Sequence, residues 1–107
     1  MATRALVQAP SSARAGDVVQ VRTLVQHAME TGYRVDAAGQ PLPRDLIRRL
    51  EARFDGELIL AAELHAAISA NPFFAFYFRL PRSGVLTLRW QGDNGFVHDE
   101  SLRITAT

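Results

Sequence analysis

The chain has 107 residues, of which 48% are hydrophobic and 21% are charged, a composition typical of one soluble globular domain over residues 1–107. Twelve basic and eleven acidic residues give a net charge of +1, which argues against a nucleic-acid-binding protein and against attraction to a membrane surface. The sequence has no cysteine, which excludes disulfides, thiolate metal sites and a cysteine nucleophile.

The N-terminal sequence, MATRALVQAP, has no charged segment followed by an apolar one, so we identify no signal peptide. No apolar run approaches the roughly 18 residues that a membrane-spanning helix needs. We therefore expect no membrane span and no membrane partner.

Apolar and polar residues alternate in short segments along the chain, and this pattern predicts strands. The first predicted strand covers residues 4–8 and ends at a turn rich in Pro and Ser. The second covers residues 18–26, where Val19, Val21 and Val25 share one face and polar side chains share the other. The second strand is therefore expected to be half-buried.

A long segment without strand periodicity follows, HAMETGYRVDAAGQPLPRDLI, residues 27–47. Most connections have about 4–6 residues, and longer ordered loops are usually functional. Prolines near its end, including Pro43, reduce the entropy lost on ordering. We interpret the segment as a recognition surface with Arg34, Asp36 and Arg44 as polar anchors, which pair with one another or with a partner. The alternative is a hairpin excursion without function.

Residues 49–54 and 57–64 are predicted to form a β-hairpin, because an Asp-Gly dipeptide separates two alternating segments. In the second strand of this hairpin, residues 57–64, we expect Leu58, Leu60 and Ala62 to face inward. A helix is the alternative for LILAAELHAAI, since Ala, Leu and Glu are good helix formers. We favour the strand, followed by an irregular connection to the Ser-Ala-Asn-Pro sequence.

The last third of the chain predicts three further strands, over residues 74–80, 86–91 and 96–105. Trp90 lies in an alternating segment and is expected in the core. In total, seven strands with turns every eight to twelve residues or so predict an all-β fold, an antiparallel β-sandwich.

The first of these three strands has two unequal faces. Phe74, Phe76 and Phe78 are expected to belong to the core. Phe73 falls with Tyr77 on the opposite face. An exposed aromatic pair of this kind is typical of an interface patch. The alternative is that the long loop folds back and covers it.

Residues with catalytic or metal-binding chemistry are few. His27, His65 and His98 have no metal-ligand spacing, and we interpret them as solvated or capping histidines. An enzyme would need a constellation such as Asp93, His98 and Asp99 near the last turn, which is more typical of a solvated turn. We therefore predict no catalytic residues, no metal and no cofactor.

Several motifs, in order along the chain, resemble the SoxZ family of the bacterial sulfur-oxidation (Sox) system. The longest is H-x-M-E-T-G-x-R-x-D-x-x-G-x-x-x-P-R-x-x-I over residues 27–47. The others are P-S-S-A-x-A-G-D from Pro10, the Asp55-Gly56 turn, S-x-N-P-aromatic from Ser69 and W-x-x-D-x-G from Trp90. One departure is Gly92, where family members often carry an acidic residue. The ordered set covers nearly the whole chain.

The resemblance implies an immunoglobulin-like sandwich that is not an enzyme and that forms a heterodimer with SoxY. In such a complex, a cysteine on the partner's flexible glycine-rich C-terminal arm carries intermediates of thiosulfate oxidation. The arm is presented to the cytochromes, hydrolase and dehydrogenase of the Sox system. The resemblance also implies a periplasmic location, reached by export together with the partner.

A stable heterodimer buries about 1,200–2,000 Å². We expect this interface to use the exposed aromatic face and the long loop. The candidate interface residues are Arg34, Asp36, Pro43, Arg44, Phe73 and Tyr77. The isolated chain is expected to be capable of self-association through the same surface. The alternative function is a free-standing ligand- or protein-binding β-sandwich outside sulfur oxidation.

Overall fold

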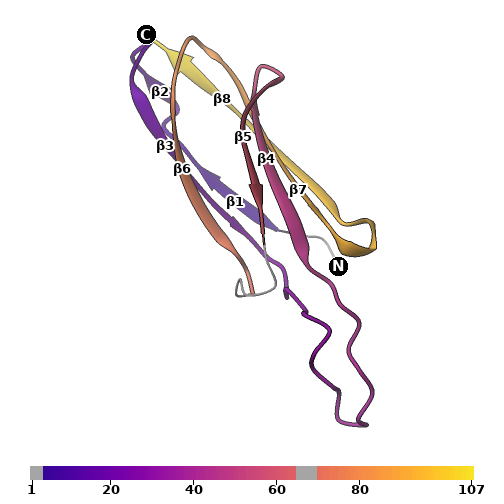
Figure 1. Ribbon diagram of the computed structural model, residues 1–107. Helices are drawn as coiled ribbons and strands as arrows, with labels where there is room; N and C mark the ends of the chain where they lie inside the picture. Colours follow the sequence, from indigo (N-terminus) through magenta and orange to yellow (C-terminus); the bar gives the residue numbers. More distant parts are fainter. Residues whose placement is uncertain (1–3, 65–69) are drawn as a thin grey trace.

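The computed structural model describes residues 4–64 and 70–107, which form a β-sandwich of two sheets (Figure 1). The elements are β1 (Ala5–Gln8), β2 (Ser12–Ala13), β3 (Val18–Val25), β4 (Ile47–Phe54), β5 (Glu57–Glu63), β6 (Phe73–Arg79), β7 (Gly84–Gly92), the 3-10 turn η1 (Asp93–Gly95) and β8 (Val97–Ala106). The predicted all-β, immunoglobulin-like sandwich is therefore confirmed.

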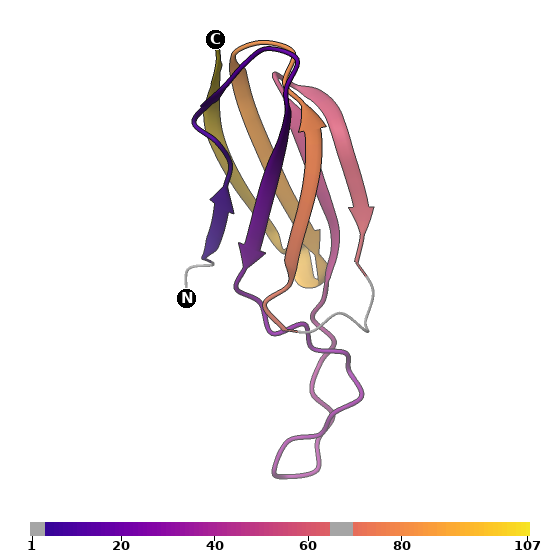
Figure 2. The same ribbon diagram turned by 90° about the vertical axis from the view of Figure 1, so that its left-hand side faces the viewer.

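One sheet has three strands in the order β1-β3-β6, and the other has five in the order β2-β8-β7-β4-β5. Neighbouring strands are antiparallel, except that β2 runs parallel to β8. The chain crosses from the first sheet to the second between β1 and β2. In Figure 2 the three-stranded sheet faces the viewer and the five-stranded sheet lies behind it.

The core lies between the sheets and is built from the inward-facing side chains of strands in which buried and exposed residues alternate. The valine face of β3 is buried, as predicted. Trp90 is 1% exposed, which confirms its place in the core. Phe76 is buried, and Phe74 and Phe78 are half-buried against the same cluster. Burial of this apolar surface is the main term that stabilises the sandwich.

All seven predicted strands are present, with limits that differ by one or two residues from those expected. The two-residue strand β2 was not predicted. It pairs Ser12 with Thr105 and Ala13 with Ala106. The pairing of β2 with β8 is made by backbone hydrogen bonds, and a strand of two residues is too short to show an alternation of side chains in the sequence.

The segment after the Asp-Gly turn is a strand, β5, which confirms the preferred interpretation over a helix. The prediction that Leu58 faces inward is wrong, because this side chain is exposed. A β-bulge between Ala52 and Arg53 shifts the register, so Leu58 lies opposite the exposed Arg53. Beyond the bulge, Leu60 and Ala62 are half-buried, as predicted.

The predicted irregular connection after β5 includes residues 65–69, which lie outside the described residues, as does His65. No helix in residues 4–64 or 70–107 is long and apolar enough to cross a membrane. The molecule is elongated, with extents of 58 × 24 × 19 Å, because the segment between β3 and β4 projects beyond one end of the sandwich (Figure 1).

Candidate functional site: a projecting hairpin and an open sheet face

Residues 26–46 form an irregular hairpin, which we call the projecting hairpin (Figures 1 and 2). Its arms are joined by isolated bridges, one between Glu30 and Asp45 and one between Val35 and Pro41. Glu30 and Asp45 exchange two backbone hydrogen bonds, of 2.7 and 2.8 Å. The long segment is therefore an ordered structure with its own backbone pairing.

His27 fixes the base of the projecting hairpin. Its Nδ1 accepts a hydrogen bond from the Met29 backbone N–H at 2.9 Å, so the neutral ring carries its proton on Nε2. Nε2 lies 3.6 Å from a carboxylate oxygen of Asp45, on the opposite arm. The ring packs edge-on against Phe96, with centroids 5.0 Å apart. Of the two expectations for His27, solvated or capping, the structure supports the second, because the side chain is buried where the arms meet the sandwich and accepts a backbone N–H.

Asp93, in η1, holds the other side of the base. Its carboxylate accepts the Leu46 backbone N–H at 3.1 Å and forms an ion pair with Arg44, with Nε–Oδ2 at 3.0 Å. Arg48 lies 3.6 Å from the same carboxylate. Burial acts to raise the pKa of Asp93, but the bonds from Leu46 and Arg44 outweigh it and hold the pKa below its ordinary value.

Gly92 lies where the hairpin base meets β7. A Cβ atom at this position would stand 2.3 Å from the Leu46 carbonyl oxygen and 3.0 Å from the Ile47 Cα. The backbone therefore leaves no room for a side chain, including the acidic one expected at this position from the resemblance. The negative charge of this turn comes from Asp93 instead.

Two of the predicted anchors bond within the hairpin. Arg34 binds the Glu30 carboxylate at 2.7 and 3.1 Å, and this hydrogen bond lowers the pKa of Glu30. Asp36 accepts the backbone N–H groups of Ala38 and Gln40, each at 2.9 Å, and so closes the tip. Pairing of Arg34 and Asp36 with each other or with Arg44, two of the alternatives left open by the sequence, is not observed, since each side chain has a nearer local partner.

The remaining hairpin candidates have different surroundings. Arg44 is bonded to Asp93, as described above, and Pro43 is exposed on the returning arm. The sequence analysis missed Tyr33 and Val35, whose side chains are 89% and 61% exposed. They alternate with charged residues, Y-R-V-D, and this period of two was the available signal.

The outer face of the three-stranded sheet, which we call the open face, carries the predicted aromatic pair. Phe73 is 55% exposed and Tyr77 is 67% exposed. The projecting hairpin extends away from the sandwich, so the alternative in which it covers these residues is not observed (Figure 2). The strand register also aligns Leu6, Leu24 and Phe73 in one row across the sheet, with both leucines exposed. The two leucines of this row were missed by the sequence analysis.

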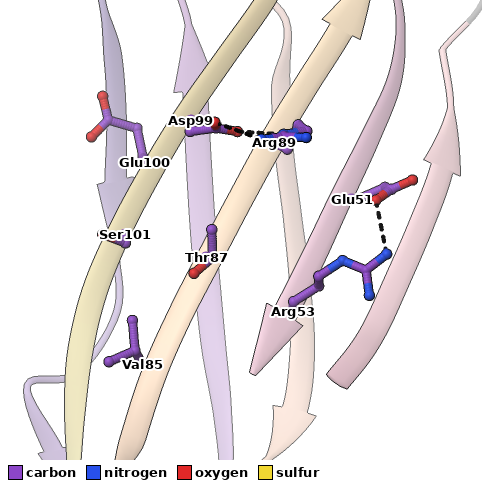
Figure 3. Close-up of a pocket in the computed structure, with 8 residues that line it drawn as sticks. All are labelled: Glu51, Arg53, Val85, Thr87, Arg89, Asp99, Glu100 and Ser101. Carbon is purple, nitrogen blue, oxygen red and sulfur yellow. Dashed lines mark hydrogen bonds and ion pairs between the residues drawn. The ribbon is translucent and has the colours of Figure 1, made fainter. Parts of the chain in front are cut away.

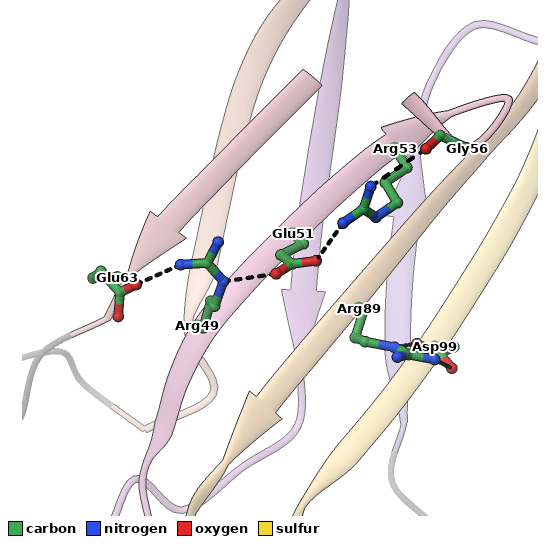
Figure 4. A network of polar contacts seen from close by, with 7 residues as sticks. All are labelled: Arg49, Glu51, Arg53, Gly56, Glu63, Arg89 and Asp99. Carbon is green, nitrogen blue, oxygen red and sulfur yellow. Dashed lines mark hydrogen bonds and ion pairs between the residues drawn. The ribbon is translucent and has the colours of Figure 1, made fainter. Parts of the chain in front are cut away.

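The outer face of the five-stranded sheet carries a ladder of ion pairs. The ladder consists of Arg49, Glu51, Arg53, Glu63, Arg89 and Asp99 (Figure 4). Glu51 accepts bonds from Arg49 at 2.7 Å and Arg53 at 3.3 Å, and the Arg49 bond lowers the pKa of Glu51. Arg89 binds both oxygens of Asp99 at 2.7 and 2.9 Å, which lowers the pKa of Asp99.

A shallow hollow of about 440 Å³ lies over this face (Figure 3). Its lining includes Thr87 and Ser101, with the arginines Arg53 and Arg89. Both guanidiniums are already bonded to carboxylates of the ladder. The hollow therefore offers an incoming anion little uncompensated charge.

The residues of the enzymatic alternative are not brought together. Asp93 is bonded to the hairpin base, and Asp99 is bonded to Arg89. His98 lies on the opposite face of β8 from Asp99, and its Nε2 is 2.8 Å from a Glu100 oxygen. In the part of the chain that the structure describes, no group of three or more His, Asp or Glu residues could hold a metal ion.

Among solved structures, the superoxide reductase (neelaredoxin) from Ignicoccus hospitalis matches with a TM-score of 0.72 and 22% identity, covering 98% of this chain and 82% of that one. The putative superoxide reductase from Thermotoga maritima matches with a TM-score of 0.66 and 18% identity, covering 96% and 85%. The sulfur carrier protein SoxY from Chlorobium limicola f. thiosulfatophilum matches with a TM-score of 0.67 and 11% identity, covering 95% and 74%. At these identities the likeness shows the fold alone.

No curated protein sequence matches the chain. A family model described as sulphur oxidation protein SoxZ matches residues 7–103. The match includes the projecting hairpin, all of β3 to β7 and most of β8. The chain therefore belongs to the SoxZ family of sulfur-oxidation proteins.

Proposed function

We propose that this chain is the non-catalytic subunit of a sulfur-compound carrier complex. It pairs with a SoxY-like subunit, whose C-terminal-arm cysteine covalently carries intermediates of thiosulfate oxidation. Its own role is to bind that subunit and to hold the arm where the Sox cytochrome, hydrolase and dehydrogenase reach it. The observation that carries the proposal is the SoxZ family match over residues 7–103.

The chemistry of the chain agrees with this division of labour. A sulfur intermediate that is carried covalently needs a thiolate nucleophile, and the chain has no cysteine. What it offers instead is an exposed aromatic pair, Phe73 and Tyr77, on a regular sheet. Aromatic side chains supply much of the energy of protein interfaces, so we assign partner binding to this face.

The projecting hairpin has a separate role in the proposal. Arg34 and Asp36 bond within the hairpin and Arg44 bonds to Asp93 at its base, so the contact groups that we assign to it are the exposed Tyr33 and Val35 near the tip and Pro43 on the returning arm. We propose that the tip touches the partner's arm or a docking enzyme. We also propose a periplasmic location, reached by export with the partner.

Co-expression tests the pairing. The untagged chain is produced with a tagged SoxY-like subunit from the same genome, and the complex is captured and examined by intact-mass analysis. The expected result is a one-to-one complex in which only the partner gains sulfur-containing adducts. A chain that is not captured, and that runs alone as a stable monomer, would contradict the proposal and favour the free-standing binding sandwich.

The interface is tested by Tyr77→Glu, which places a charge in the centre of the aromatic face. We expect this variant to lose capture of the partner. The matched control is Thr87→Glu, on the outer face of the five-stranded sheet. Equal capture of the two variants would remove the open face from the interface.

A further inference from the structure

The open face is unusual in its charge as well as in its apolar surface. None of its three strands, β1, β3 and β6, contains an acidic residue, although Asp17 precedes β3 in the adjoining turn. Arg22 and Arg79 are exposed on this face, and Arg4 adjoins it through a backbone bond to Gln26. The open face is therefore apolar and cationic at once.

The two arginines lie at different places on the open face, Arg22 beside the apolar row and Arg79 at the opposite end of β6 from Phe73. Arg22 lies beside the row and stacks its guanidinium over the Phe73 ring, 5.6 Å from the centroid. Arg79 donates to the Gly16 carbonyl, a neutral group that leaves its charge uncompensated. Within the described residues, neither arginine is part of an ion pair. Their charge is available to an incoming group, in contrast to Arg49, Arg53 and Arg89 of the five-stranded sheet, which are paired.

A hollow of about 390 Å³ adjoins one end of the row. Leu6 and Leu24 supply apolar walls, and Arg4 and Asn71 supply polar ones. A space of this kind accepts an apolar side chain of a partner as an anchor, which is how the strongest contacts of protein interfaces are built.

We propose that the open face binds a protein surface that presents an apolar anchor, a carboxylate close to the anchor and a second carboxylate farther along the same surface. The anchor enters the hollow beside Leu6 and Leu24, and the carboxylates meet Arg22 and Arg79. This inference rests on the proposed function and adds to it the chemistry that the SoxY-like subunit must show.

A second copy of this chain is a poor occupant of the same face. Two copies related by a two-fold axis would bring two patches of arginine together with no acidic residue on the strands of either face to compensate them. Like charges across an interface oppose association. A partner with carboxylates removes this repulsion and gains attraction.

The test measures the association rate of the tagged SoxY-like subunit with the wild-type chain and with Arg22→Glu/Arg79→Glu, at low and high salt. Opposite charges accelerate encounter, and salt screens this effect. We expect the double variant to associate about tenfold more slowly at low salt. We also expect the wild-type rate to fall steeply with salt and the rate of the variant to fall little.

The matched control is Arg103→Glu, on the outer face of the five-stranded sheet, which should change the rate less than about twofold. Thermal melting of each variant checks that it is folded. If the wild-type chain binds and its rate is independent of salt, or if both variants bind equally fast, this inference is wrong while the proposed function stands. If the wild-type chain does not bind at all, the proposed function itself fails.

Two further outcomes would overturn the inference by naming a different occupant. Sedimentation of the isolated chain tests for a second copy, and a concentration-dependent dimer abolished by Leu24→Glu would identify one. Co-sedimentation with phosphatidylglycerol vesicles tests for an anionic membrane. Vesicle binding that Arg22→Glu/Arg79→Glu abolishes would assign the face to lipid.

Discussion

The two outer faces of the sandwich differ in the partners of their arginines, although Arg103 on the five-stranded face is also outside the ion pairs of the described residues. On the five-stranded sheet, Arg49, Arg53 and Arg89 bond to carboxylates of neighbouring residues (Figure 4). On the open face, Arg22 has an aromatic ring as its neighbour, and the three strands contain no carboxylate. The number of arginines on a face therefore does not show whether their charge is available for binding, which depends on the partner of each arginine.

The apolar residues follow the same division. The open face aligns Leu6, Leu24 and Phe73 across all three of its strands. The five-stranded face also exposes Leu58, Val85 and Val97, but each lies opposite a polar residue of the neighbouring strand, so they form no continuous row. A sheet face that stays in contact with solvent usually resembles the five-stranded face, and a sheet face that is covered by another surface usually resembles the open face with its apolar row.

The largest expected effect is the loss of partner affinity when a glutamate is placed on the open face but not when it is placed on the five-stranded face. Leu24→Glu should lower the affinity for the SoxY-like partner by about 30-fold or more, because a central contact of an interface is worth about 2 kcal/mol or more. Val85→Glu, on the five-stranded face, should leave the affinity within about twofold. Titration calorimetry of both variants measures this, and equal losses would erase the distinction between the faces.

Acid should act on the paired carboxylates. The pKa values of Glu51, Asp93 and Asp99 are lowered in the folded chain. Their contribution to stability is therefore complete above the ordinary carboxyl pKa of about 4 and is lost as the pH falls through the lowered values. Thermal melting should show a constant contribution from these groups above pH 5 or so and a fall of several degrees towards pH 3.

Asp99→Asn provides the control for the acid experiment. This variant should lose part of the decline between pH 4 and 3 or thereabouts, because one lowered pKa is removed. A stability curve that begins to fall above pH 6 would point to groups other than these carboxylates.

Smaller effects are expected when a single arginine of each face is replaced by alanine. Arg89→Ala should lower the melting temperature by a few degrees at most, because exposed ion pairs contribute little and the pair is screened by salt. Arg22→Ala should not lower it through any lost ion pair, and should instead slow partner association. Arg89→Ala should therefore change the melting temperature and not the association rate, and Arg22→Ala should change the association rate and not the melting temperature. If both variants change the same quantity, the two faces do not differ.

The strand pattern of the sandwich could be predicted from the sequence because each half-buried strand alternates with a period of two. Burial departs from this pattern where local geometry breaks the period. The bulge after Ala52 exposes Leu58, and no residue type at the bulge announces it. The row of Leu6, Leu24 and Phe73 depends on the register of three strands distant in sequence, which an alternating pattern cannot supply.

The interior of the projecting hairpin was predicted less well than its existence. Its length and motif marked residues 27–47 as a special segment, but the burial of His27 and Met29 was not predicted, although it continues the period of two of β3 beyond the end of the strand. Asp93, which holds the base, comes from a turn far along the chain. The exposed Phe73 and Tyr77 were predicted, because that prediction needed only the alternation within β6.

The base of the projecting hairpin also has a mechanical consequence. The His27 N–H donates to the Asn71 side-chain oxygen at 2.9 Å, and the Asn71 N–H donates to the His27 carbonyl at 2.6 Å. Asn71 stands two residues before Phe73, the end of the apolar row. This pair of bonds fixes the base of the projecting hairpin to the residues that lead into β6, so we expect a displacement of the hairpin base to shift the start of β6 and with it the edge of the open face.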